Sequence, residues 1–125
     1  MFIRKRSEVN GVNWGNGSSH RLLTKHDDMG FTVCHTVVKA GTESRLQYRN
    51  HLEACYCIGG SGHVKTADGS ETFHIEPGTI YALNQHDAHF LVASEDEDLE
   101  LISVFNPPLT GDEVHKLDGS GFSQY

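Results

Sequence analysis

The sequence lacks the features of several large classes of protein. No apolar run approaches the roughly 20 residues of a membrane-spanning helix, and residues 1–6 lack the apolar stretch of a secretion signal. Basic residues are few, because 10 Lys and Arg stand against 17 Asp and Glu, which gives a formal net charge of −7. This charge disfavours nucleic acid and anionic membranes as partners. We therefore expect a cytoplasmic protein that binds neither.

Cysteine is also scarce. The three residues, Cys34, Cys55 and Cys57, are an odd number, which argues against a disulfide framework. In an extended strand Cys55 and Cys57 project from the same face about 7 Å apart, which is too far to bridge easily. We interpret all three as free, buried thiols. A metal clip of Cys55 and Cys57 is the alternative, although this pair lacks the C-x-x-C spacing of zinc sites.

Long helical patterns are absent, and short β segments take their place. The 125 residues suffice for one domain, and 37% apolar residues with 13 glycines suit many short strands joined by turns. The β-branched and alternating segments predict strands at residues 31–38, 46–48, 54–58, 63–66, 72–75, 79–83, 89–93 and 99–105. This pattern favours an all-β jelly-roll barrel with little helix.

The segments between these strands have their own signals. A hairpin is predicted at residues 67–70, which include Asp68-Gly69, and an acidic turn at residues 94–98. Residues 10–19 are rich in Gly, Asn and Ser and predict a loop. Residues 20–25 are compatible with a strand or a helical turn, and residues 111–115 with one helical turn.

Strand alternation gathers three unusual side chains. Residues of equal parity share a face, so Glu53 lies with Cys55 and Cys57, and Tyr81 and His89 each lie with a leucine. If these faces point inward, Glu53, Tyr81 and His89 converge among apolar residues, where electrostatic interactions are strong. A carboxylate, a phenol and an imidazole suit Fe(II) or Zn(II) better than Mg(II) or Ca(II). Three ligands also leave positions open for substrate or water.

Each of these residues also has a structural interpretation. Tyr81 alone is typical of a core tyrosine with a satisfied hydroxyl, and His89 alone is typical of a structural histidine. An inward-facing Glu53 is costly unless paired, which favours a functional role. We interpret five further histidines as surface or packing residues, namely His26, His35, His63, His74 and His86.

The spacing of the central region matches the two-part signature of a cupin barrel. The first motif contains a glycine, a His-x-His pair, a glutamate and a second glycine. The corresponding positions, with both histidines replaced, are Gly41, Gln47, Arg49, Glu53 and Gly60. In the second motif Tyr81 replaces the histidine after the Pro-Gly turn, and Asn84 is retained. We therefore predict one cupin domain over residues 1–125, with an N-terminal arm at 1–30 and a tail at 109–125 able to close the barrel.

Several segments spread over nearly the whole chain have a distinctive wording. They read F-I-R-K-R-S-E-V, D-D-M-G-F, Y-R-N-H-L-E-A-C-Y-C-I, P-G-T-I-Y-A-L-N-Q-H-D-A-H and V-F-N-P-P-L-T-G-D-E-V-H. Together they resemble the ectoine synthase family. The resemblance implies a homodimeric enzyme that closes the small molecule N-γ-acetyl-L-2,4-diaminobutyrate into the ring of ectoine with loss of water. It also implies Fe(2+), with Zn(2+) or another divalent first-row metal as the alternative, bound by Glu53, Tyr81 and His89.

The resemblance implies further site residues. The catalytic group corresponds to Tyr48, Ser103, Glu113 and His115. The substrate-binding group corresponds to Trp14, Ser19, Arg21, Thr36 and Phe105. Arg21 is suited to hold a carboxylate in a two-pronged hydrogen bond. Glu113 and His115 are suited to clamp an ammonium or move protons, and a solvated tail is their structural alternative.

Three positions depart from the family pattern. Where the family usually has a tryptophan this chain has Gly17, and a shifted loop would let Trp14 fill the same space. Ser103 stands in place of the family's pocket cysteine, and Cys55 falls where the family often has valine. These departures leave two alternatives open, an enzyme that acts on a different N-acylated amino acid and a barrel that binds a small solute without catalysis.

Overall fold

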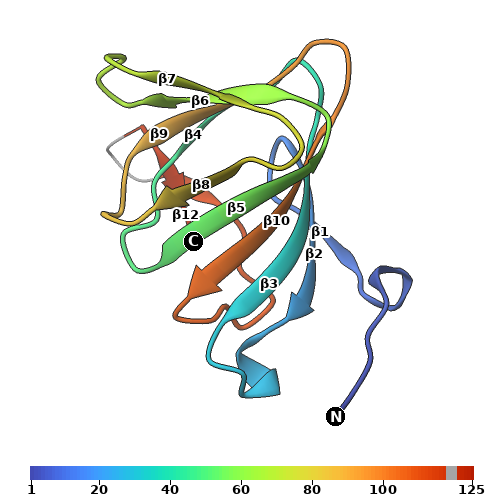
Figure 1. Ribbon diagram of the computed structural model, residues 1–125. Coiled ribbons are helices and arrows are strands. Elements are labelled where there is room, and N and C mark those ends of the chain that lie inside the picture. Colours follow the sequence, from blue (N-terminus) through green and yellow to red (C-terminus); the bar gives the residue numbers. More distant parts are fainter. Residues whose placement is uncertain (118–120) are drawn as a thin grey trace.

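The computed structural model describes residues 1–117 and 121–125, and two six-stranded sheets face each other in it (Figure 1). The first sheet has the order β1-β2-β3-β10-β5-β8 and the second the order β11-β12-β4-β9-β6-β7. The strands are β1 Gly11–Asn13, β2 Gly17–Leu23, β3 Thr32–Val38, β4 Glu43–Leu46, β5 Leu52–Gly59, β6 Gly62–Thr66, β7 Thr72–Ile75, β8 Ile80–Leu83, β9 His89–Ala93, β10 Leu99–Asn106, β11 Lys116–Leu117 and β12 Ser123–Gln124. The described residues include two short 3-10 helices, η1 Arg6–Glu8 and η2 Lys25–Asp27. The prediction of an all-β barrel with little helix is confirmed.

Alternation along the strands builds the core between the sheets. In β5, Glu53, Cys55 and Cys57 are buried, whereas Tyr56 and Ile58 are exposed. β10 buries Leu99, Leu101, Ser103 and Phe105 in the same way. The interior is therefore lined by one face of each sheet, as expected when inward and outward residues alternate.

Several local predictions need correction. The strand predicted at residues 46–48 is β4, which spans Glu43–Leu46 and ends where the prediction began. Within the predicted loop at residues 10–19, β1 and the start of β2 form strands, because β2 pairs with both β1 and β3. The helical turn predicted at residues 111–115 does not form. There the Glu113 carboxylate accepts hydrogen bonds from backbone N–H groups that precede it.

Other predictions are confirmed. β6 and β7 pair as a hairpin across the predicted turn at residues 67–70. Residues 20–25 contain both alternatives, because they include the end of β2 and the start of η2. All three cysteines are free and buried. Gly60 has a φ of 71°, and a Cβ there would lie 2.0 Å from the Asp98 carbonyl oxygen, so the turn after β5 requires glycine.

The segments expected to form an arm and a tail take part in the sheets. Residues 11–23 extend the first sheet through β1 and β2. In the tail, β12 pairs in parallel with β4, at Ser123 opposite Leu46. Residues 118–120 of the predicted tail lie outside the described residues. In the described part of the chain, no helix has the length and apolar character needed to cross a membrane.

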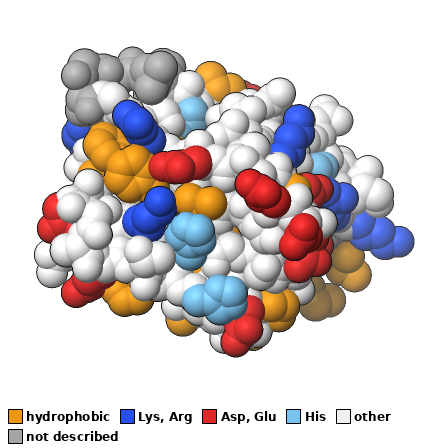
Figure 2. Space-filling model, turned by 90° about the horizontal axis from the view of Figure 1, so that it is seen from above, with side chains coloured by type: hydrophobic (Ala, Val, Ile, Leu, Met, Phe, Trp, Pro, Cys, Tyr) orange, Lys and Arg blue, Asp and Glu red, His pale blue; other side chains and the backbone are white. Residues whose placement is uncertain are grey.

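The surface has two contrasting regions. On the face seen in Figure 2, acidic, basic and histidine side chains are interspersed with apolar ones. The outward-facing positions of neighbouring strands in the first sheet carry exposed apolar side chains, namely Tyr56 and Ile58 on β5, Ile80 on β8 and Val104 on β10. Ile80 and Tyr56 are direct partners in the register of β5 and β8. These four apolar side chains share the outward face of three adjacent strands.

Candidate metal and substrate site

A row of side chains crosses the interior of the first sheet. Successive register partners on β2, β3, β10, β5 and β8 are Arg21, Cys34, Ser103, Cys55 and Tyr81. Glu53 lies in the adjacent row, where its partner on β10 is Phe105. The strand pairing thus brings together residues that are up to 82 positions apart in the sequence.

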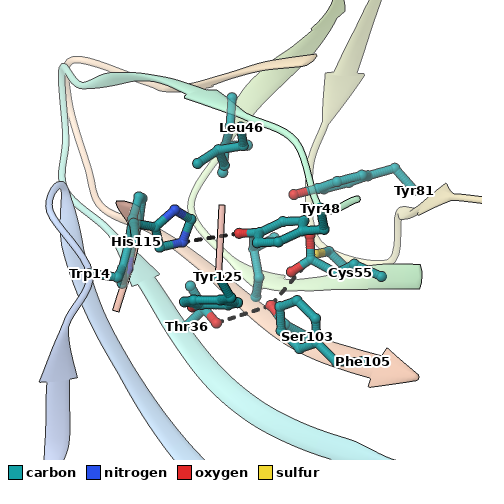
Figure 3. A pocket seen from close by; sticks show the side chains of 13 residues that line it. Trp14, Thr36, Leu46, Tyr48, Cys55, Tyr81, Ser103, Phe105, His115 and Tyr125 are labelled. Carbon is teal, nitrogen blue, oxygen red and sulfur yellow. Dashed lines mark hydrogen bonds between the residues drawn. The ribbon is translucent and has the colours of Figure 1, made fainter. Parts of the chain in front are cut away.

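A small cavity lies against this row (Figure 3). Its volume is about 20 Å³, which is about the space of one water molecule. The polar part of the wall comes from Glu53, Cys55, Tyr81, Ser103 and Thr36. The aromatic part comes from Trp14, Tyr48, Phe105, His115 and Tyr125. A larger hollow of about 830 Å³ opens between β7 and β8, and Tyr81 lines both spaces.

Glu53 is a buried carboxyl group beside this cavity. It is 8% exposed, and no basic side chain forms an ion pair with it in residues 1–117 and 121–125. Burial raises the pKa of Glu53 to about 8, and a hydrogen bond with the Cys55 thiol offsets part of this effect. A cation bound nearby would supply the missing countercharge.

His89 presents a buried nitrogen without a partner. The residue is 2% exposed, and its Nδ1–H donates a hydrogen bond of 3.0 Å to the Asp87 carbonyl oxygen. Its Nε2 has no hydrogen-bond partner within the described residues. A backbone bond at one ring nitrogen that leaves the other free is typical of a metal-binding histidine. Burial also lowers the pKa of His89, which keeps the imidazole neutral and able to bind a metal.

Tyr81 lies near both of these residues, because it lines the small cavity with Glu53 and the larger hollow with His89. Its ring centroid is 6.4 Å from that of His89, and it faces Cys55 across the pair of β5 and β8. Burial raises the pKa of Tyr81 well above its usual range. Within the described chain, no three side chains drawn only from His, Cys, Asp and Glu form a metal-binding group, so a site here depends on Tyr81. The donors available fit a divalent first-row metal.

Two of the predicted site residues form a polar link on the same sheet. The hydroxyls of Thr36 and Ser103 are joined by a hydrogen bond of 3.0 Å, and Ser103 Oγ lies 3.5 Å from Cys55 Sγ. Ser19 is buried one strand further along, opposite Thr36 in the register of β2 and β3. The polar groups therefore continue from the predicted metal-binding residues toward β2.

The tail builds the remaining wall. His115 Nε2 and the Tyr48 hydroxyl are joined by a hydrogen bond of 3.1 Å, and His115 Nδ1 lies 3.0 Å from Ser123 Oγ. The Tyr125 ring packs against Tyr48, Phe105 and His115, with centroid distances of 5.2, 5.5 and 4.5 Å. Burial lowers the pKa of His115 to about 4, so the imidazole is neutral near pH 7.

Arg21 and Glu113 lie behind this wall. Arg21 is 4% exposed, its Nη1 donates to the Gly111 carbonyl oxygen at 2.8 Å, and Glu113 Oε1 lies 3.9 Å away. Its Nε and Nη2 have no hydrogen-bond partner among residues 1–117 and 121–125. Burial raises the pKa of Glu113, but hydrogen bonds from the backbone N–H groups of Thr110 and Gly111 outweigh this effect. The net pKa is lowered, so the carboxylate is charged. The predicted proton-moving pair is thus divided, because only His115 lines the cavity.

Trp14 lies in the cavity wall. Its Nε1–H donates to the Val37 carbonyl oxygen at 3.3 Å, and its ring centroid is 5.4 Å from that of His115. A Cβ at Gly17 would lie 1.8 Å from the same Val37 oxygen. The backbone therefore excludes any larger residue at position 17, and the indole reaches the cavity from position 14.

Replacing Gly17 with alanine should destabilise the fold. The added methyl group must push β2 away from β3, an overpacking effect that costs about 1–3 kcal/mol or more. Thermal unfolding should show a midpoint several degrees lower. Gly59→Ala is the matched control, because its Cβ would come unusually close only to the flexible end of the Glu100 side chain, at 2.7 Å, and not to backbone. Equal losses in both variants would contradict the steric explanation.

Sequence reasoning missed two residues of the wall. Cys55 was placed on the inward face but interpreted as an inert thiol. Tyr125 carried no signal, because a tyrosine at the end of a polar tail has no periodicity that reveals burial. Conversely, four predicted site residues do not line the small cavity, namely Ser19, Arg21, His89 and Glu113, and of these His89 lines the larger hollow.

Comparison with known proteins decides the family. A family model described as ectoine synthase matches residues 1–124. The chain belongs to the ectoine synthase family. An L-ectoine synthase of Desulfatibacillum aliphaticivorans is 46% identical over 126 residues, covering 96% of this chain and 95% of that protein. One from Halalkalibacterium halodurans is 47% identical over 117 residues, covering 94% and 87%.

Solved structures agree with this assignment. The crystal structure of ectoine synthase from P. lautus superposes with a TM-score of 0.82 at 41% identity, covering 89% of this chain and 81% of that one. A cupin 2 conserved barrel protein from Salinispora arenicola, at 19% identity and a TM-score of 0.67, covers 84% and 87% and shares the fold. The predicted cupin barrel and the resemblance to the ectoine synthase family are both confirmed.

Proposed function

We propose that the protein closes N-γ-acetyl-L-2,4-diaminobutyrate into ectoine with loss of water, at a site that binds Fe(2+) or, alternatively, Zn(2+). The observation that carries this proposal is the position of Arg21. A buried guanidinium with two unpaired nitrogens lies in the same register row as Tyr81, a predicted metal ligand. The substrate carries a carboxylate that fits the arginine and an amide carbonyl that fits a metal.

Glu53, Tyr81 and His89 are the residues that would hold the metal. When bound, the metal supplies Lewis acidity toward the amide carbonyl of the substrate. The chain itself provides orientation, because Arg21 fixes the carboxylate at one end of the substrate. The α-amine then attacks the carbonyl carbon within the same molecule, so a folded substrate conformation supplies much of the rate.

Tyr48 and His115 are placed to handle protons. The α-ammonium must lose a proton before it attacks, and the departing hydroxyl must gain one. His115 is neutral near pH 7 and is hydrogen-bonded to the Tyr48 hydroxyl inside the cavity. We assign proton transfer to this pair. Glu113 is already engaged by two backbone N–H groups and lies beside Arg21, so it positions the arginine and the tail.

The reaction is tested with purified protein loaded anaerobically with Fe(II) or Zn(II). Given N-γ-acetyl-L-2,4-diaminobutyrate, the loaded protein should form ectoine, and chelator-treated protein should not. N-acetylated diamino acids of other chain lengths serve as competing substrates. Preferential turnover of one of these would contradict the proposed substrate, and ligand binding without any turnover would contradict catalysis.

The tail closes one side of the site. Its residues His115 and Tyr125 form part of the cavity wall, and exclusion of water favours a reaction that releases water. Removing the residues after Leu109 should therefore lower turnover by at least about 10²-fold, the usual contribution of a general acid or base. Leu109 itself is fully buried and bonded to Thr32, so this truncation spares an anchor of the fold. Circular dichroism checks folding, and undiminished turnover by the folded variant would contradict the role of the tail.

We further propose that the protein is a cytoplasmic homodimer. The exposed apolar face at Tyr56, Ile58, Ile80 and Val104 lies beside β8, which is an edge strand of the first sheet. A second copy packed there would bury apolar area and cover that edge. Light scattering should give twice the mass of 13.8 kDa. A mass of 13.8 kDa at micromolar concentration would contradict the dimer.

A further inference from the structure

Ser123 lies in the tail, next to a residue to which proton transfer is assigned above. Its hydroxyl oxygen is 3.0 Å from His115 Nδ1 and 3.1 Å from the Arg45 carbonyl oxygen. On the other side of the same imidazole, Nε2 is 3.1 Å from the Tyr48 hydroxyl (Figure 3). Ser123, His115 and Tyr48 therefore form one hydrogen-bonded chain, which begins at the backbone of β4 and ends at the wall of the small cavity.

The Arg45 carbonyl oxygen fixes the direction of this chain. A carbonyl oxygen can only accept a hydrogen bond, so the single hydroxyl proton of Ser123 is donated to it. The Ser123 oxygen is left with lone pairs and must accept a hydrogen bond from His115 Nδ1. Since the imidazole is neutral near pH 7, its one N–H lies on Nδ1 and its lone pair lies on Nε2. The Tyr48 hydroxyl consequently donates its proton to Nε2.

The serine is held in place by contacts with two strands of the second sheet. Its backbone carbonyl oxygen accepts the Gln47 N–H at 3.0 Å, and Ser123 is the register partner of Leu46 in the pair of β12 and β4. The neighbouring Phe122 ring packs against Phe90 on β9, with centroids 5.7 Å apart. These contacts fix the serine hydroxyl relative to the backbone of β4, which is its acceptor.

We infer that Ser123 is a positioning residue, which holds His115 as the tautomer whose Nε2 lone pair faces Tyr48. This inference rests on the proposed function, which assigns proton transfer to Tyr48 and His115. A proton leaving the substrate α-ammonium passes to the Tyr48 oxygen while the Tyr48 proton passes to Nε2. The reverse transfer delivers a proton to the departing hydroxyl, which leaves as water, and restores the neutral imidazole. Ser123 acts only through His115, because it does not line the small cavity.

The opposite tautomer blocks this path. With the proton on Nε2, the imidazole donates to the Tyr48 oxygen and has no lone pair there to receive a proton. Ser123→Ala removes the acceptor at Nδ1 and allows this tautomer. It should therefore lower kcat by about 10²–10⁴-fold, the contribution expected of a correctly protonated general base. KM should stay nearly unchanged, because the substrate makes no contact with Ser123.

Nitrogen NMR of the full-length protein, labelled with nitrogen-15 histidine, reads the tautomer directly. Protonated and unprotonated ring nitrogens give separate signals, and His115→Gln identifies those of His115. At neutral pH with Zn(II), which is diamagnetic, the wild type and Ser123→Thr should carry the proton on Nδ1, because threonine keeps the hydroxyl. In Ser123→Ala the proton should move to Nε2. Phe122→Leu is the matched control, because it weakens the attachment of the tail but keeps the hydroxyl, and it should retain the wild-type tautomer.

Steady-state kinetics with N-γ-acetyl-L-2,4-diaminobutyrate complete the test. Ser123→Thr should recover most of the kcat that Ser123→Ala loses. Circular dichroism checks that both variants are folded, and the wild-type tautomer tests the inference without any variant.

The outcomes separate the role of Ser123 from the proposed function. A wild type that forms ectoine but carries the proton on Nε2 would overturn the positioning role and leave the function standing. The same holds if Ser123→Ala keeps either the Nδ1 proton or the wild-type kcat. A wild type that forms no ectoine would overturn the proposed function and the role of Ser123 together. A change of tautomer with loss of kcat in Ser123→Ala, reversed in Ser123→Thr, supports the inference.

Discussion

Replacing Glu53 with glutamine should abolish metal binding and ectoine formation while stabilising the metal-free fold. Glutamine has nearly the same shape but carries no charge, so the proposed metal centre loses its carboxylate ligand. In the metal-free protein the carboxylate is buried without a cation, and its pKa of about 8 lies above the ordinary value of 4.5. Glutamine removes this unfavourable burial.

The effect on stability has a definite pH dependence. Because the pKa of Glu53 is raised in the folded state, the protonated form is favoured, and folding stability is lost as pH rises from about 4.5 toward 8. At pH 7 the difference between wild type and Glu53→Gln is on the order of 3 kcal/mol. The difference should vanish below pH 4.5, where the carboxyl is protonated in both folded and unfolded states.

Thermal unfolding in the presence of chelator, at pH values from 4.5 to 8, measures this difference. Added Zn(II) should then raise the unfolding midpoint of the wild type and leave that of Glu53→Gln unchanged. Glu97→Gln, at an exposed position of the acidic turn, is the control and should follow the wild type. A metal-free Glu53→Gln that is less stable than wild type at pH 8 would contradict the burial of an unpaired carboxylate.

Replacing Arg21 with methionine should raise the KM for the substrate by roughly 30-fold to several thousand-fold, because losing one partner of a buried charged pair costs about 2–5 kcal/mol. The Arg21 guanidinium carbon lies 5.2 Å from the centroid of the Tyr125 ring. Methionine keeps much of the apolar volume of the arginine side chain next to this ring. It removes every N–H group that could bind a carboxylate. Steady-state kinetics measure the effect.

A modified substrate distinguishes recognition from general damage. An analogue with a carboxamide in place of the carboxylate should be a poor substrate for the wild type, whereas Arg21→Met should treat acid and amide alike. Arg4→Met is the control, because Arg4 forms a surface ion pair with Asp27 far from the cavity and should leave KM unchanged. If Arg21→Met still preferred the acid as strongly as the wild type does, the carboxylate would bind elsewhere.

The sequence predicted the barrel because its strands obey simple alternation. The parity of Glu53, Cys55 and Cys57 placed all three inside, and the structure buries all three. Turn and loop propensities gave a wrong prediction for residues 10–19, where the close approach of a distant backbone segment decides that a strand forms. The Gly/Asn/Ser-rich stretch before Ser19 becomes strand because Gly17 allows β2 to approach Val37, and no pattern within that stretch encodes the approach.

The site was predictable only in part for a similar reason. Strand parity identified Glu53, Tyr81 and His89 as a group, whereas Arg21 and the tail residues came from family resemblance. Periodicity cannot show that Glu113 turns back to cap Thr110 and Gly111. Nor can it show that Tyr125 returns to the interior and packs against His115. Such contacts depend on the path of an irregular segment.

Because the tail is attached through the short strand β12, we expect the turnover rate to depend on how often β12 separates from β4. β12 is two residues long and pairs with β4 at one register position. There the Ser123 carbonyl oxygen accepts a hydrogen bond of 3.0 Å from the Gln47 N–H, and the Ser123 hydroxyl donates to the Arg45 carbonyl oxygen. Because these hydrogen bonds are few, they can break while the barrel stays folded. Product release through this side would then be governed by local opening on the microsecond to millisecond scale. Mutations that tighten β12 against β4 would gain stability and lose turnover.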